Sequence, residues 1–110
     1  MTSPISLATA VGIGNAAQTA AGTTQATATA LLADHVSVPS VASGAGVILN
    51  PANGGEVFSV ANGDATDPLL IYPPVGSSFN GTTVNTALTL PAGRAALFIF
   101  ISPTVINAVY

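Results

Sequence analysis

The chain has 110 residues, of which one is basic and four are acidic, and it contains no lysine. An ordinary soluble domain carries about 25% charged residues, whereas this chain carries 5%. The net charge of −3 leaves no basic surface for nucleic-acid phosphates or anionic lipid headgroups. A hydrophobic content of 49% with so little charge also argues against intrinsic disorder. We therefore expect one folded domain without a nucleic-acid or membrane partner.

The chain has no cysteine, which excludes disulfides, thiolate metal ligands and cysteine nucleophiles. The longest charge-free stretches, residues 1–33 and 68–93, are interrupted by Gly, Pro, Asn and Thr. Neither offers the roughly 20 predominantly apolar residues that a transmembrane helix requires. Nothing in this composition indicates a cofactor, and we expect none.

The first 30 residues form a segment of distinct composition, because Ala and Thr occupy 16 of these positions. Gly12 and Gly14 disfavour a helix over residues 5–21, since each costs about 1 kcal/mol relative to Ala. The segment predicts an extended N-terminal arm, residues 1–30, that lies on another surface; a disordered tail is the alternative. Its large apolar side chains are the expected anchors: Ile5, Leu7, Val11 and Ile13.

From residue 31 to residue 110, turn signals alternate with β-rich runs. The Asn-Gly pairs supply the positive φ that tight turns need, and prolines preset the first turn position. Such pairs occur at Asn53-Gly54, Asn62-Gly63 and Asn80-Gly81. The runs between the turns cover roughly residues 34–41, 45–50, 56–61, 68–72, 83–90, 95–101 and 104–110. Seven strands at this spacing predict an all-β domain, an antiparallel sandwich or barrel.

Two of these runs differ in their apolar pattern. In residues 83–90, Val84, Thr86, Leu88 and Leu90 share one face, which is the alternation of a half-buried strand. Residues 95–101 are apolar on both faces. Such a strand is either a central strand covered by a loop, or it packs under the arm, or it meets another subunit. The expected seam residues are Leu97, Phe98, Ile99 and Phe100, and the sequence leaves open which pair faces inward.

Candidate catalytic and metal-binding residues are few. His35 is the only imidazole and Asp34 directly precedes it. Neighbours in a strand point to opposite faces, so Asp34 is poorly placed to orient His35 in a Ser/His/Asp triad. Asn62, Asp64 and Asp67 are spaced faintly like a calcium loop but lack its bidentate glutamate. Hydrogen bonds to the local backbone explain such residues in a turn, and we expect neither catalysis nor metal binding.

A series of turn motifs in residues 56–101 carries a family resemblance. It comprises a strand ending in Asn62-Gly63, the corner Tyr72-Pro73-Pro74-Val75-Gly76, the turn Phe79-Asn80-Gly81, and Ala92-Gly93-Arg94 before an apolar strand. In this order the motifs resemble small virion proteins of tailed bacteriophages, of the capsid decoration (cement) type. Phe79 and Arg94 stand where that pattern has Ile and Lys. The resemblance implies a β-rich structural protein of the particle and carries over no catalytic residue.

The resemblance and the scarcity of charge together predict a subunit that buries much of its surface. We expect a homo-oligomer, with a trimer suggested by the virion context alone, seated on the capsid exterior. Its partners would be the major capsid protein and its own copies, and the arm would tie neighbouring capsid subunits together. The alternative function is a tail-fibre or adhesin module that binds host carbohydrate through the turns at 62–67 and 72–81. A small hydrolase that uses His35 is a third hypothesis.

Overall fold

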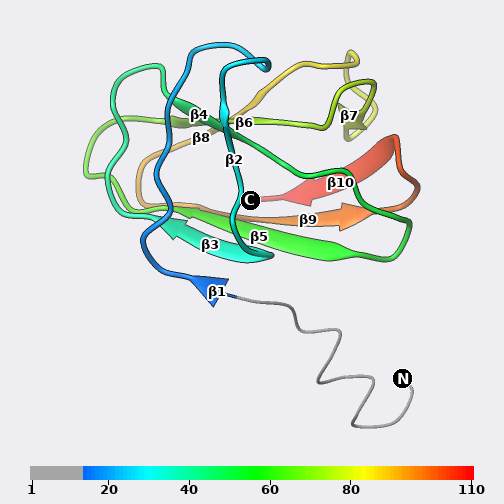
Figure 1. Ribbon diagram of the computed structural model, residues 1–110, viewed down its shortest axis with the longest axis horizontal. Helices are drawn as coiled ribbons and strands as arrows, with labels where there is room; N and C mark the ends of the chain where they lie inside the picture. Colours follow the sequence, from blue (N-terminus) through cyan, green and yellow to red (C-terminus); the bar gives the residue numbers. More distant parts are fainter. Residues whose placement is uncertain (1–13) are drawn as a thin grey trace, which may run out of the picture.

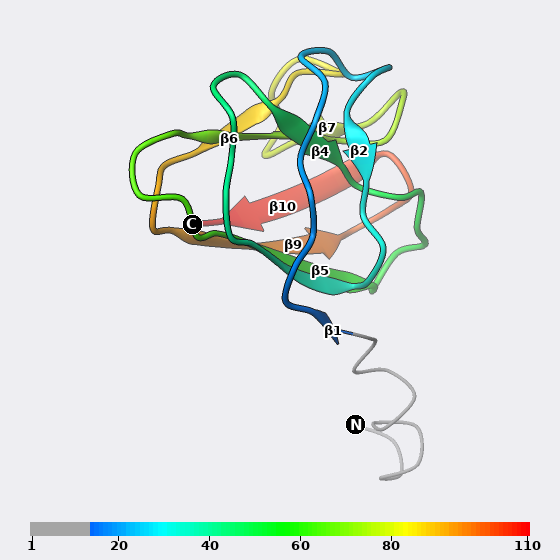
Figure 2. The same ribbon diagram turned by 60° about the vertical axis from the view of Figure 1, so that its left-hand side comes forward.

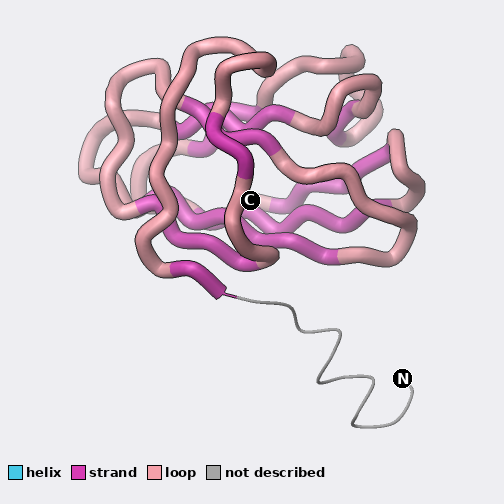
Figure 3. The backbone as a smooth tube through the Cα atoms, viewed as in Figure 1, coloured by secondary structure: helices cyan, strands magenta, loops and turns pink. Residues whose placement is uncertain are grey.

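The computed structural model describes residues 14–110, and these residues form ten short strands and no helix. The all-β prediction is confirmed for this part of the chain. The four predicted arm anchors, Ile5, Leu7, Val11 and Ile13, lie outside the described residues. Figures 1 and 3 show the strands gathered into two layers that face each other.

Each layer is one mixed β-sheet (Figure 1). The six-stranded sheet has the order β1 (Gly14–Asn15), β3 (His35–Val38), β5 (Val57–Asn62), β9 (Ala95–Phe100), β10 (Val105–Val109), β7 (Ser78–Phe79). The four-stranded sheet has the order β2 (Thr29–Ala30), β4 (Gly46–Ile48), β6 (Leu69–Tyr72), β8 (Leu88–Leu90).

The first six strands wind as three stacked coils. Each coil gives one strand to the six-stranded sheet and the next to the four-stranded sheet, so that β1, β3 and β5 are parallel neighbours, as are β2, β4 and β6. The chain then reverses, because β8 pairs antiparallel with β6, and β9 pairs antiparallel with β5. Figure 2 shows the coils crossing from one sheet to the other. The result is a solenoid-like arrangement of three parallel coils followed by an antiparallel return.

This topology corrects the predicted antiparallel sandwich or barrel. Each of the seven predicted runs coincides with a strand, β3 to β6 and β8 to β10, and three two-residue strands were not predicted. The error lies in the connections. The turns at Asn53-Gly54 and Asn62-Gly63 do not close hairpins; they carry the chain into the other sheet, where the strand joins a parallel neighbour. Turn residues indicate where a strand ends, but not which strand it pairs with.

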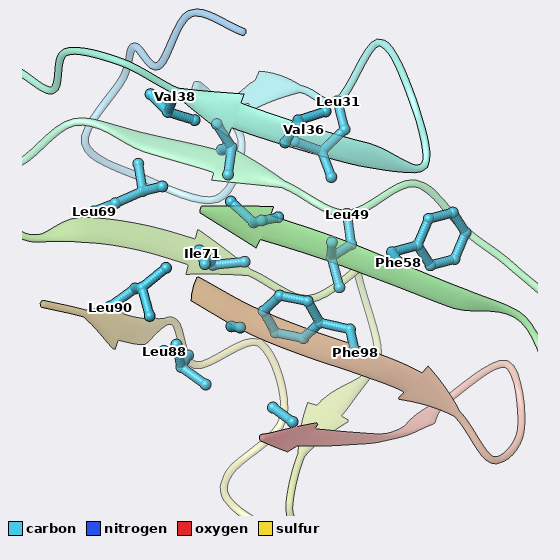
Figure 4. Packing of buried hydrophobic residues seen from close by; sticks show 14 of the residues in the cluster. Leu31, Val36, Val38, Leu49, Phe58, Leu69, Ile71, Leu88, Leu90 and Phe98 are labelled. Atoms are coloured by element: carbon cyan, nitrogen blue, oxygen red, sulfur yellow. The ribbon is translucent and has the colours of Figure 1, made fainter. Parts of the chain in front are cut away.

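The hydrophobic core fills the space between the two sheets (Figure 4). Two aromatic pairs lie within it: the rings of Phe58 and Phe100 meet edge to face at 5.4 Å, and those of Phe79 and Phe98 lie 5.3 Å apart. Aliphatic side chains from both sheets complete the core, among them Val36, Val38, Val60 and Ile106 from one sheet, and Val47, Leu69, Ile71, Leu88 and Leu90 from the other.

The predicted strand at residues 83–90 is shorter in the structure. Only Leu88–Leu90 form a strand, and Val84 is half exposed. Asn85 has a positive φ of 66°, which interrupts an extended strand, and its Oδ1 accepts a 2.7 Å hydrogen bond from the backbone N–H of Gly76. This bond fastens the 80–87 loop to the turn after β6, so the alternation before Leu88 does not mark a strand.

Residues 14–30, the part of the predicted arm that the structure describes, lie against both sheets. They provide β1 and β2 and bury Gln18, whose side chain is 1% exposed. The Gln18 Oε1 accepts from the N–H of Leu32 at 3.0 Å, and its backbone N–H donates to Ser37 at 3.0 Å. A deletion of residues 1–25 would therefore remove β1 and this contact. An N-terminal deletion that keeps all ten strands must therefore end at residue 13.

Candidate interaction surface

Strand β9 has one core face and one surface face. Phe98 and Phe100 are fully buried between the sheets, whereas Leu97 is 40% exposed and Ile99 is partly exposed on the opposite face. Among the predicted seam residues, the phenylalanines therefore belong to the core, and Leu97 and Ile99 belong to the surface.

The strand register extends this surface across three strands. Ile99 lies between Val57 and Asn107, and Leu97 lies between Ser59 and Val109. We call this surface the outer face. It consists of the residues of β5, β9 and β10 that point away from the core: Val57, Ser59, Ala61, Ala95, Leu97, Ile99, Val105, Asn107 and Val109.

The outer face contains no charged residue. Four of its aliphatic side chains are large and at least 40% exposed: Val57, Leu97, Val105 and Val109. One sheet face of a small β-protein normally meets water and carries polar side chains. Large exposed apolar patches mark protein or membrane contacts, ligand grooves or aggregation-prone surfaces. The outer face is an uncharged and largely aliphatic sheet surface of this kind.

His35 lies at the border of the outer face. Its Nδ1 is 2.8 Å from the Oγ of Ser59 on the neighbouring strand, and both residues line a shallow groove together with Gly14, Asn15 and Ala16. The structure thus brings a serine and a histidine together, a pairing that the spacing of the sequence did not reveal. The contact is a hydrogen bond between the neighbouring strands β3 and β5.

The loop after β5 is fastened by Asp64. Its Oδ1 accepts from the backbone N–H of Val41 at 3.0 Å, and its Oδ2 accepts from Thr66 at 3.0 Å and Asp67 at 2.8 Å. These backbone hydrogen bonds, the one from Val41 foremost, lower the pKa of Asp64 from 3.8 to about 2. Both carboxylate oxygens are therefore engaged with the backbone. Within residues 14–110, no group of three or more acidic or histidine side chains could hold a metal ion.

This carboxylate makes stability depend on pH in acid. Because the folded pKa of about 2 lies below the unfolded value of 3.8, the ionised group stabilises the fold above about pH 4. That contribution is lost as the pH falls from about 4 to about 2. In Asp64→Asn, an NH2 group replaces one of the two carboxylate oxygens that accept hydrogen bonds. We therefore expect a lower melting temperature at pH 7, and a melting temperature that changes less between about pH 4 and about pH 2. Equal slopes for wild type and Asp64→Asn would contradict the assignment.

A second surface feature lies where the two sheets end. A cleft of about 300 Å³ is bounded by β7, the 80–87 loop, β8 and the C-terminal Tyr110. Phe79 and Leu88 provide apolar walls, and Thr82, Thr86 and Thr89 provide hydroxyl groups. No charged residue lines it. The cleft and the outer face are thus two uncharged surfaces on one small domain.

The part of the chain that the structure describes contains no helix long and apolar enough to span a bilayer. Comparisons of the sequence with protein-family models and with curated proteins, and of the fold with solved structures, find no match.

Proposed function

We propose that this protein is a structural component of a bacteriophage virion that decorates and stabilises the capsid from outside. The outer face carries the proposal, because an exposed, uncharged and largely aliphatic sheet surface favours contact with a protein partner. The overall scarcity of charge agrees with it. Exposed surfaces of monomeric domains hold about 25–35% charged residues by design practice, whereas this chain has 5%.

The turn motifs of the family resemblance support the proposal through local geometry. Asn80 and Gly81 both have positive φ, 49° and 73°, and the N–H of Thr82 donates to the carbonyl of Phe79 at 2.8 Å. This is the tight turn that Asn-Gly favours. Gly93, with φ 75°, makes the turn that leads into β9. The residues shared with the phage pattern therefore shape the chain at strand ends.

The mechanism of stabilisation is mass action. A protein that binds the assembled shell, and not its dissociated subunits, shifts the equilibrium toward the shell. Many copies acting on one shell add through multivalency. In this proposal the major capsid protein and neighbouring copies of the chain are the partners, and the outer face with Leu97 and Ile99 forms the seam. The N-terminal arm ties neighbouring capsid subunits together.

Replacing Val109 with Asp tests the outer face. Val109 is 61% exposed, so Val109→Asp should leave the melting temperature within a few degrees of wild type. A charge buried in an apolar seam is costly, and we expect at least tenfold weaker attachment to purified shells stripped of the protein. Val75→Asp is the matched control, because Val75 is 78% exposed on the turn after β6, away from the outer face. Equal attachment of both variants would refute a role for the outer face.

Copy number separates the two function classes that the sequence left open. A decoration protein is present in hundreds of copies per particle, which quantitative mass spectrometry of purified particles can count. Tens of copies or fewer would support the tail-fibre or adhesin alternative. In that alternative the loop at 62–67 has little to offer a sugar, since the Asp64 carboxylate is engaged by three backbone N–H groups.

A further inference from the structure

Strand β8 is an open edge of the four-stranded sheet. On β6, the N–H of Leu70 donates to Ala45 and the carbonyl of Tyr72 accepts from Leu49, so both residues direct their backbone groups toward β4. Thr89 is the partner of Leu70 in the antiparallel pair. In an antiparallel pair, the backbone N–H and C=O groups of two opposite residues either hydrogen-bond to each other or point away from the partner strand. The N–H and C=O of Thr89 therefore point to the outer side of β8. On that side, residues 14–110 provide no further strand of this sheet.

The uncharged cleft lies beside this open edge. Its walls come from β8 on one side and from Phe79 and Tyr110, at the edge of the other sheet, on the opposite side. Side chains of a strand alternate between the two faces of a sheet. A strand added along β8 would thus hydrogen-bond to Thr89 and place every second side chain in the cleft. The edge supplies backbone bonding and the cleft supplies apolar contact.

Residues 5–13 of this chain have the matching pattern. Large or β-branched side chains occupy every odd position, namely Ile5, Leu7, Thr9, Val11 and Ile13. Small residues occupy every even position, namely Ser6, Ala8, Ala10 and Gly12. This strict alternation is typical of a strand with one buried face. The segment lies outside the described residues, and it directly precedes β1.

The position of β1 favours a second copy as the acceptor. β1 and β7 are the two opposite edges of the six-stranded sheet, five strand spacings apart, or about 24 Å at the usual spacing. Nine extended residues span about 30 Å at most. A segment crossing its own sheet would use most of that length before it reached β8. The same residues can lie in full along β8 of a neighbouring molecule.

We propose that residues 5–13 of one copy add as a strand along β8 of a second copy, with the odd-numbered side chains in the cleft. This inference rests on the self-association part of the proposed function. The donor and the acceptor lie at opposite edges of the protein, so the contact is head to tail. Repeated head-to-tail contacts close into a ring or continue as a filament, which agrees with a cyclic oligomer such as the predicted trimer.

Engineered cysteines test the contact directly, because the chain has no cysteine of its own. Thr89 is exposed and points away from the core, so its cross-strand neighbour is an even-numbered residue of the arm. Ala8→Cys or Ala10→Cys, mixed with Thr89→Cys and oxidised, should give a disulfide-linked heterodimer on a non-reducing gel. Thr66→Cys, an exposed position in the loop after β5, is the control acceptor and should not cross-link. Equal yields with Thr66→Cys, or none with Thr89→Cys, would overturn the proposal.

A second measurement uses the mass of the full-length protein by light scattering. Thr89→Pro removes an outward N–H, which edge strands tolerate, and should lower the mass of the oligomer with an unchanged circular dichroism spectrum. Thr89→Val keeps the N–H and the branched shape and should retain the wild-type mass. A wild-type protein that is monomeric at all concentrations, or a Thr89→Pro variant that keeps the wild-type mass, contradicts the inference.

Shell attachment distinguishes failure of this inference from failure of the proposed function. If Thr89→Pro keeps the wild-type oligomer mass but no longer attaches to shells, the edge receives a capsid segment; the inference is then wrong and the proposed function stands. If the cysteine pair cross-links but wild-type protein attaches to no shell, the inference stands and the capsid function is wrong.

Discussion

Phe98→Ala is expected to lower the free energy of unfolding by about 3–5 kcal/mol, as truncations of buried phenylalanines do. Phe98 is fully buried on the central strand β9 and its ring lies 5.3 Å from that of Phe79. Both sheets close over this position, so the cavity cannot collapse easily. Because small domains have only about 5–15 kcal/mol in total, the melting temperature should fall by about 15 °C. Thermal unfolding followed by circular dichroism measures the effect.

Leu97→Ala is the control for this substitution. Leu97 is the adjacent residue on β9 but points to the outer face and is 40% exposed. We expect its truncation to cost about 1 kcal/mol or less, because surface substitutions away from special features are usually small. The result expected for Leu97→Ala is weaker self-association at nearly unchanged stability. Equal destabilisation by the two variants would mean that the two faces of β9 are not distinct.

Asn62→Leu is expected to destabilise the fold by about 2–5 kcal/mol, because it leaves several backbone groups without partners. Asn62 ends β5 and is 1% exposed. Its Nδ2 donates to the carbonyls of Asp67 at 2.9 Å and Leu90 at 3.1 Å, and its Oδ1 accepts from the N–H of Asp64 at 3.0 Å. Leucine has the same number and branching of side-chain heavy atoms and can make none of these bonds. Urea unfolding gives the change in free energy.

Asn50→Leu is the matched substitution for this test. Asn50 is exposed, and its Nδ2 makes one hydrogen bond, 2.9 Å long, to the carbonyl of Leu31. Water can replace that bond in the variant, so we expect a loss below about 1 kcal/mol. If Asn50→Leu lowered the free energy of unfolding as much as Asn62→Leu, burial of the hydrogen bonds of Asn62 would not explain the effect.

The sequence predicted where strands lie better than how they pair. Alternating apolar residues and turn signals are local, and they located seven strands. Pairing depends on contacts between residues far apart in the chain. In addition, β1, β2 and β7 have two residues each, too short for any periodicity. The polar Gln18 gave no apolar signal either, although it is buried where the first coil meets both sheets.

The candidate surface was predictable only in part, because local sequence patterns do not show which distant strands lie side by side. The doubly apolar run at 95–101 indicated a strand with a second buried or contacting face, and in the structure the second face of β9 is apolar and partly exposed. The partners of Leu97 on that face, Ser59 and Val109, come from strands 38 and 12 residues away in sequence. Only the register brings them together. The cleft beside β8 likewise forms from Phe79, Leu88 and Tyr110, which no motif connects.

The reversal of the chain after the third coil has a consequence for synthesis. In the six-stranded sheet, the late strand β9 sits between β5 and β10, and its pairing joins Val57 to Ile99. Contacts so distant in sequence slow folding, and the nascent coils lack their central neighbour until residues 95–100 have left the ribosome. Loss of the last 16 residues would therefore remove a strand from the middle of a sheet, although every strand before residue 95 would still be present.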